Sequence, residues 1–172
     1  VSSSSSKEPI VTGTDIPASG EQTSFFKNAS NVSISLKFSD KALYDLSRYG
    51  GDTSKYKHKY DDLYFPATFT AVVGSTTYKY FDVGVRMKGA TSRREIASSD
   101  GTINNSCHLK INFKATFDDA LYDLDLFSCY KHEWTDAEKN TRKDRRFFGL
   151  EKLDLKYLPR NEGATNGETY SQ

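Results

Sequence analysis

The sequence predicts an α+β fold with a mainly antiparallel sheet and a few short helices. Segments in which apolar and polar residues alternate recur along the chain, and this period of two is typical of half-buried strands. Aromatic residues make up 13% of the 172 residues, with 11 Tyr and 11 Phe, and these residues favour strands over helices. A chain of this length can fold as one domain that buries roughly two thirds of the unfolded chain's surface. We therefore expect one sheet-based domain with an aromatic-rich core.

The composition divides the chain into a linker and a domain. Residues 1–24 are rich in Ser, Thr, Gly and Pro and begin with a pure serine run, which is typical of a flexible linker. Residues 25–172 carry the alternating segments and form the expected domain. A serine run often remains between a cleaved signal, or a lipid-anchored cysteine, and a surface domain. We therefore favour a secreted or cell-surface protein, with a lipid anchor upstream of Val1 as one means of attachment and an interdomain linker as the alternative.

The domain is expected to begin with a strand and a short helix. Residues 31–38 alternate and predict the strand. Ser39 is placed to cap a helix that runs through Ser47 and ends at Gly50-Gly51. The polar residues 55–62 that follow predict a solvated loop.

A hairpin forms the next part of the predicted sheet. Residues 65–73 and 78–88 read as two strands, and the four residues 74–77 between them supply the turn. Residues 106–117 predict a further strand, with alternate residues on opposite faces. Consecutive strands are neighbours more often than not, so this strand is expected beside the second strand of the hairpin.

The last third of the domain mixes loops with one helix and one strand. Residues 118–134 combine acids with aromatics and predict a loop with a helical turn. Thr135 can cap a helix, with Glu138 in the position of the capping-box acid. The basic run 139–146 is expected to be a solvated face, although its clustered arginines could instead hold a phosphate or an acidic peptide. Residues 153–158 predict a short final strand.

Cations gather at the end of the second hairpin strand and on the strand after it. Arg86 and Lys88 share one face of the hairpin strand, and Lys110 lies on the polar face of the next. Gly89 then allows a turn, and residues 91–94 add two hydroxyls and two more cations. Such a set can seat an anion or a phosphate, or it can be ordinary surface charge.

Other patterns in the sequence exclude several classes of function. The formal net charge is +1, so no bulk attraction to nucleic acid or membranes is expected, and no apolar run is long enough for a membrane span. Two cysteines, Cys107 and Cys129, do not make a disulfide scaffold, and their pairing is left open. Neither they nor the three scattered histidines have the spacing of a zinc site.

An acidic segment is the second candidate for chemistry. Its carboxylates could bind Mg²⁺ or Ca²⁺, although a solvated acidic turn is the better interpretation because an EF-hand's glycine and terminal glutamate are absent. The acids are Asp118, Asp119, Asp123 and Asp125. The chain has no G-x-S-x-G, G-x-G-x-x-G, P-loop, HRD or DFG motif, so motifs do not assign it to ordinary kinases or nucleotide hydrolases.

Three blocks together resemble the CotH kinase family, named for spore coat protein H. Residues 83–93 (VGVRMKGATSR) are similar to the family's VRxKGxSSR block. Residues 106–113 (SCHLKINF) resemble its KxSxKIxF strand, and residues 148–156 (FGLEKLDLK) resemble its FxGLKKLxLK block. The order and spacing of the blocks fit, and the resemblance covers roughly residues 31–163.

Two positions depart from the family's pattern. Ala90-Thr91 replaces the usual Asn-Ser, although Thr91 retains a hydroxyl, and Asn105 stands where a lysine is common. The resemblance implies the first lobe of an atypical bacterial kinase, secreted or at the cell surface, which uses ATP with a divalent metal such as Mg²⁺ to phosphorylate Ser or Thr of partner proteins.

The resemblance also implies roles for particular residues. The nucleotide-binding side chains would be Arg86, Lys88, Ser92, Arg93 and Lys110. The family's metal-binding and catalytic aspartates are expected beyond Gln172, so this chain would be the N-terminal portion of the domain, inactive alone and with no metal ligands of its own.

A non-catalytic surface module that binds a protein or a glycan is the alternative function. The aromatic residues of segments 56–64 and 122–134 suit sugar stacking as well as they suit packing.

Overall fold

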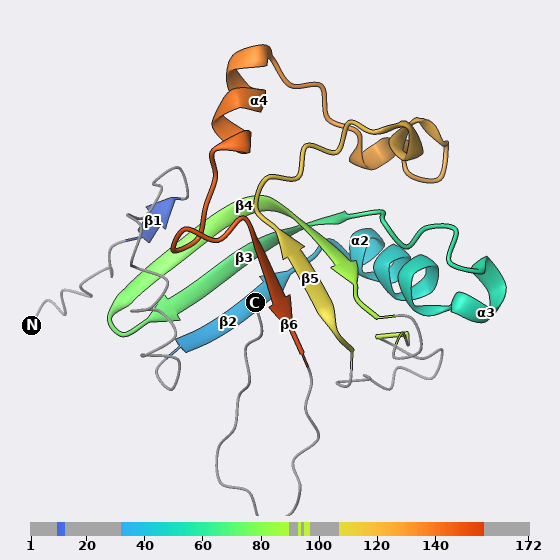
Figure 1. The fold of residues 1–172 in the computed structure, drawn as a ribbon, viewed down its shortest axis with the longest axis horizontal. Helices are drawn as coiled ribbons and strands as arrows, with labels where there is room; N and C mark the ends of the chain where they lie inside the picture. Colours follow the sequence, from blue (N-terminus) through green and yellow to red (C-terminus); the bar gives the residue numbers. More distant parts are fainter. Residues whose placement is uncertain (1–9, 13–31, 90–92, 94, 97–106, 157–172) are drawn as a thin grey trace, which may run out of the picture.

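A computed structural model describes residues 10–12, 32–89, 93, 95–96 and 107–156, and it confirms the α+β class (Figure 1). Five strands form an antiparallel sheet in the order β2-β3-β4-β5-β6, and β1 pairs in parallel with β4. The strands are β1 (Ile10–Thr12), β2 (Val32–Lys37), β3 (Phe65–Val73), β4 (Thr76–Met87), β5 (Leu109–Asn112) and β6 (Lys152–Leu155). β1 lies within the segment whose composition predicts a linker; the rest of residues 1–24 lies outside the described residues.

Short helices connect the strands. They are α2 (Asp40–Asp45), the π-helix η2 (Leu46–Gly50), α3 (Thr53–Tyr56), the 3-10 helices η3 (Ala120–Asp123) and η4 (Ser128–Tyr130), and α4 (Asp136–Lys143). Figure 1 shows α2 and α3 together at one end of the sheet, whereas α4 stands apart from them. In the described part of the chain, no helix combines the length and apolarity that a membrane span requires.

Both predicted helix caps are confirmed. The Ser39 hydroxyl accepts a hydrogen bond from the Ala42 N–H at 3.2 Å, which satisfies a donor at the start of α2. Thr135 and Glu138 form the reciprocal capping box at the start of α4. The first helical segment continues past Ser47 as η2 and ends at Gly50, at the predicted Gly50-Gly51 stop.

The hairpin turn is shorter than predicted. The predicted strand 65–73 matches β3, but the turn contains Gly74 and Ser75 alone, and β4 already begins at Thr76. Gly74 adopts a left-handed backbone with φ of 62°, which allows this tight reversal. Threonines suit the pleated backbone of a strand, so Thr76 and Thr77 pair with β3 instead of forming the turn.

Residues 55–62 are largely exposed and 57–62 form turns, as their polarity predicts, but the segment is also anchored to the core. The segment begins within α3, and Tyr60 is buried. Tyr56 and Tyr60 both contact Tyr49, and Tyr60 also packs edge-on against Phe127. Aromatic rings bury large apolar areas, so they draw this otherwise polar segment onto the core.

The core lies on one face of the sheet and is rich in aromatic rings, as the composition predicts. Phe69, Tyr80, Phe113 and Phe147 are buried and contact one another with centroid distances of 5.0 to 6.0 Å. The end of β4 and the π-helix also pack together, since a Cβ added at Gly50 would lie 3.0 Å from the Met87 side chain. The opposite face of β4, β5 and β6 therefore remains available for polar residues.

Candidate functional site

The register of the sheet brings the predicted cations together. Arg86 on β4 lies opposite Lys110 on β5, and Lys110 lies opposite Asp154 on β6. Successive side chains of a strand point to opposite faces, so these residues share the face away from the buried Ile111. The predicted adjacency of the two strands is confirmed. We call Arg86, Lys88, Lys110 and Asp154 the polar row.

Asp154 is the centre of the polar row. It is 8% exposed, and its Oδ2 accepts a hydrogen bond from the Lys88 ammonium group. Its Oδ1 lies 4.0 Å from the Lys110 Nζ and is a buried atom with no hydrogen-bond partner among the described residues. The carboxylate therefore holds Lys88 in place and places a second lysine within ion-pair distance.

Arg86 is fixed by the segment that leads into β3. Its Nη1 donates to the Asp61 carbonyl at 2.7 Å and lies 3.2 Å from an Asp62 carboxylate oxygen. The guanidinium also lies over the Tyr64 ring, 5.5 Å from its centroid. These contacts hold Arg86 beside the polar row, while the exposed Asp62 carboxylate leaves that ion pair open to solvent.

Arg93 is close to this group but is largely covered. Its side chain is 4% exposed. Its Nη1 lies 3.0 Å from the Asp61 Oδ1 and donates to the Gly50 carbonyl at 3.4 Å. Its Nε donates to the Gly89 carbonyl. Burial lowers the pKa of Arg93, and the Asp61 charge partly opposes that effect. The structure thus links Arg93 to Arg86 through Asp61. Ser92, the remaining predicted site residue, lies outside the described residues.

The network around the polar row is nearly balanced in charge. It joins four cations, Arg86, Lys88, Arg93 and Lys110, to three carboxylates, Asp61, Asp62 and Asp154. A bound anion would therefore compete with carboxylates for cations that are already ordered. Such preorganised donors hold an anion at little further cost in side-chain entropy.

The sequence interpretation missed the acidic half of this network. Asp154 sits between Leu153 and Leu155, and the alternation alone puts its side chain on the polar face, as it does for Lys110. That signal was present in the sequence. Asp61 carried no comparable signal, because its role depends on the position of a loop.

The basic run 139–146 is exposed or partly exposed over most of its length, as predicted for a solvated face, but the prediction is wrong for two of its arginines. Arg142 and Arg145 are each 6% exposed. Arg142 donates to the carbonyls of Ala115 and Asp82, and Arg145 donates to the carbonyl of Phe81. Buried arginine needs acceptors, and these carbonyls supply them.

Carboxylates of the acidic segment make separate local contacts, which agrees with its interpretation as an acidic turn. Asp118 accepts from Thr116 and pairs with Lys139, and both contacts lower its pKa. Asp119 caps η3, and Asp123 pairs with Lys131. Among residues 107–156 and the other described ranges, no group of three or more His, Cys, Asp or Glu could hold a metal ion. Cys107 and Cys129, both described, are not joined in a disulfide.

The aromatic segments considered for sugar stacking are mostly used for packing. Tyr60 and Tyr122 are buried. Trp134 is partly exposed and packs against His132 at 3.7 Å between ring centroids. The aromatic rings of the first segment therefore pack against the core.

Comparison of the chain with protein-family models, with curated protein sequences and with solved structures gave no match. The family assignment and the activity are therefore proposals that depend on the residues themselves.

Proposed function

We propose that the polar row binds the phosphate groups of ATP. We further propose that the protein is an atypical kinase of the CotH type, secreted or at the cell surface, that transfers the γ-phosphoryl group of ATP to Ser or Thr hydroxyls of partner proteins. This chain would supply the phosphate-binding cations.

The observation that supports this proposal best is the ion pair between Lys88 and Asp154. In protein kinases a strand lysine contacts the phosphates of ATP while a carboxylate from another element holds that lysine in place. Lys88 follows directly after β4, and Asp154 lies on β6, so two separate segments meet in a pair of this kind. Lys110 and Arg86 add two more cations on the same face.

The proposed chemistry divides between binding and transfer. Phosphoryl transfer requires positioning of the phosphates and neutralisation of charge on their oxygens more than it requires covalent catalysis. Lys88, Lys110 and Arg86 would orient and neutralise these oxygens, with Lys88 shared between Asp154 and a phosphate. The γ-phosphorus would form its new bond to the hydroxyl oxygen as its bond to ADP breaks, and the hydroxyl proton would pass to a carboxylate outside the described residues.

A divalent metal would neutralise charge between the phosphates when bound. The described residues do not form a metal site by themselves, since Asp154 is already within reach of two lysines and no group of three ligands occurs among them. The proposal therefore places the metal ligands, like the proton acceptor, outside the described part of the chain.

Phosphoryl transfer by the full-length protein tests this function. The protein is incubated with γ-labelled ATP, Mg²⁺ or Mn²⁺ and a mixture of Ser- and Thr-containing protein substrates. We expect label in substrate or in the protein itself, and a loss of at least about 100-fold in rate with Lys88→Ala, because the lysine would act directly on the transferred phosphate.

Lys37→Ala is the matched control, since Lys37 is an exposed lysine on β2 of the same sheet. It should transfer label at the wild-type rate. Absence of label in folded wild-type protein, or an equal rate for Lys88→Ala, would contradict the proposed activity.

A further inference from the structure

A bulge in the middle of β4, a few residues before Arg86, creates a second feature of this strand. Ala67 of β3 pairs with Val83 and Phe69 pairs with Tyr80, so Phe81 and Asp82 together oppose the single residue Thr68. Asp82 has a positive φ of 52°, as the extra residue of a bulge often does. The bulge leaves Phe81 with an exposed side chain, at 52%.

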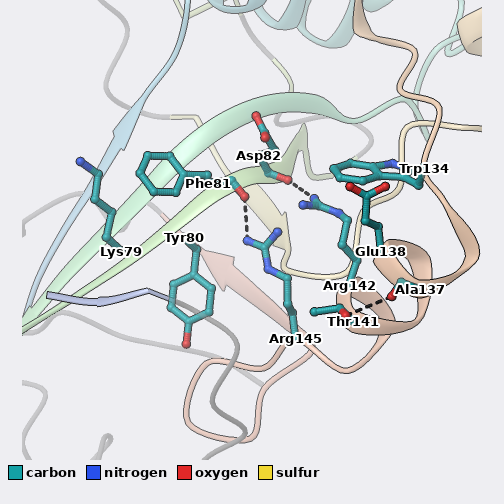
Figure 2. Close-up of a pocket in the computed structure, with 10 residues that line it drawn as sticks. All are labelled: Lys79, Tyr80, Phe81, Asp82, Trp134, Ala137, Glu138, Thr141, Arg142 and Arg145. Atoms are coloured by element: carbon teal, nitrogen blue, oxygen red, sulfur yellow. Dashed lines mark hydrogen bonds between the residues drawn. The ribbon is translucent and has the colours of Figure 1, made fainter.

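Two buried arginines bind the backbone at this bulge. β4 pairs with β1 over Thr77–Lys79 and with β5 over Gly84–Met87. Between these two pairings, Arg145 donates to the carbonyl of Phe81 and Arg142 to the carbonyl of Asp82 (Figure 2). Side chains of α4 and the residues after it thus take the place that a strand would occupy along this part of β4.

These guanidinium groups are buried without a carboxylate in contact. In the described part of the chain, neither Arg142 nor Arg145 forms an ion pair, and Arg145 Nε has no hydrogen-bond partner. Burial, followed by the charge of Arg142, lowers the pKa of Arg145 to about 10, and the exposed Asp82 only partly opposes this. Buried charges in proteins are usually paired, so a missing counter-charge is a feature to be explained.

The two arginines line a pocket with aromatic walls. Its volume is about 430 Å³, within the range of small-molecule sites. Figure 2 shows the Phe81 ring on one side of the guanidinium groups and the Trp134 ring on the other. Lys79, Asp82 and Glu138 also line it. The Glu138 carboxylate is occupied by the Thr135 N–H and hydroxyl, and Asp82 is exposed.

We propose that this pocket binds a small organic carboxylate with a flat apolar body. The carboxylate supplies a counter-charge in contact with Arg142 and Arg145, which the exposed Asp82 does not provide. The apolar body packs against the Phe81 ring and beside Trp134, over whose ring the Arg142 guanidinium lies at 4.5 Å from the centroid. An acid of the size of 3-phenylpropanoate matches both requirements. This site is separate from the polar row and does not depend on ATP binding.

The charge of the ligand is the feature that distinguishes this site from a general apolar pocket. A neutral ligand of the same shape keeps the contacts with the rings but leaves both arginines with the exposed Asp82 as their nearby opposite charge and no carboxylate in contact. Hydrogen bonds to charged groups contribute more than neutral ones, so we expect the carboxylate to bind at least about tenfold more tightly than its amide.

The test is a titration of the full-length protein with 3-phenylpropanoate and, separately, with 3-phenylpropanamide. Trp134 is the one tryptophan of this chain, so its fluorescence reports binding at the pocket, and Trp134→Phe assigns the signal. We expect a Kd of about 1 mM or below for the acid. Equal affinity for acid and amide, tighter binding of a neutral methyl glycoside, or no fluorescence change would overturn the proposal.

Two variants separate binding from folding. Arg145→Gln keeps an N–H donor for the Phe81 carbonyl but removes the charge. It should therefore weaken binding of the acid by about tenfold and leave binding of the amide unchanged. Phe81→Ala removes an exposed ring of the pocket and should weaken binding of both ligands. Tyr44→Ala removes another exposed aromatic ring and should weaken binding of neither. If Phe81→Ala binds both ligands as the wild type does, the pocket is not their site.

Discussion

Asp154 is the residue on which the geometry of the polar row depends. It is the single carboxylate within reach of both Lys88 and Lys110 among the described residues, and it is nearly buried. Removal of one partner from a buried ion pair leaves an uncompensated charge, and this costs more than the pair itself contributes. The two lysines retain partial exposure, which reduces that cost.

Asp154→Asn should lower the free energy of unfolding by about 1–3 kcal/mol, because Lys88, Lys110 and the nearby Arg86 would repel one another. Urea denaturation at pH 7 and low salt measures this change. Added salt should reduce it, since ions screen repulsion between partly exposed charges.

Glu151→Gln is the matched control for this prediction. Glu151 also pairs with two cations, Lys114 and Arg146, but it is exposed. Its loss should change stability much less than the loss of Asp154. Equal effects of the two substitutions would mean that Asp154 is not the centre of the network.

At the scale of elements, α4 depends on its cap because the helix is short and polar. Its capping box satisfies backbone donors at the first turn, and the Thr135 N–H and hydroxyl lower the pKa of Glu138 below its ordinary value of 4.5. A carboxylate with a depressed pKa in the folded state stabilises the fold above the unfolded pKa. That contribution is lost as the pH falls through the folded pKa.

Thr135→Ala should therefore cost about 1 kcal/mol at pH 7, the usual cost of losing an N-cap hydroxyl. The difference from wild type should shrink as the pH falls below 4.5, because protonation of Glu138 weakens in the wild type a capping box that the variant has already lost. Urea unfolding at a series of pH values from 7 to 3 checks both parts. If the difference in stability between the variant and the wild type stays constant over this range, the contacts of the cap do not set the pKa of Glu138.

β4 is the element that joins the two sites, and Gly84 allows its close packing between them. A Cβ at Gly84 would lie 2.6 Å from the Ala115 Cβ and 3.0 Å from the Tyr64 Cβ. Neither neighbour is the end of a flexible side chain, so the backbone would have to move.

Gly84→Ala should destabilise the protein by about 1–3 kcal/mol through this overlap. Because the Tyr64 ring also contacts the Arg86 guanidinium, the substitution should also weaken the binding of any anion at the polar row. Thermal unfolding measures the first effect. Gly74→Asn serves as the control, because nothing lies within 4 Å of a Cβ there and asparagine tolerates a left-handed backbone. An equal loss of stability in both variants would refute the steric explanation.

For the whole molecule, the sequence predicts local features better than contacts between distant segments. The period of two places β2, β3 and the end of β4 correctly, and the caps at Ser39 and Thr135 follow from residue type alone. These features depend on residues a few positions apart. The alternation on adjacent strands also anticipated the meeting of Arg86 and Lys110.

The features that were missed depend on tertiary contacts. Arg142 and Arg145 look like solvated charges in the sequence, but the carbonyls of Phe81 and Asp82 at the β4 bulge, together with that of Ala115, supply the acceptors that their burial needs. Asp61 reaches Arg93 only because aromatic packing of Tyr60 draws its segment onto the core. Neither the bulge nor that packing has a signal within a short window of sequence.

Binding of ATP to the polar row is the central claim, and one comparison tests it most directly. Full-length protein is titrated by calorimetry with ATP and with adenosine, each in the presence of Mg²⁺, for the wild type and for Lys88→Ala, Arg86→Ala and Lys37→Ala. We predict that ATP binds at least about tenfold more tightly than adenosine and that this advantage is lost in the first two variants but kept in Lys37→Ala. If folded wild-type protein binds no ATP, or if ATP and adenosine bind equally well, the polar row does not recognise phosphate.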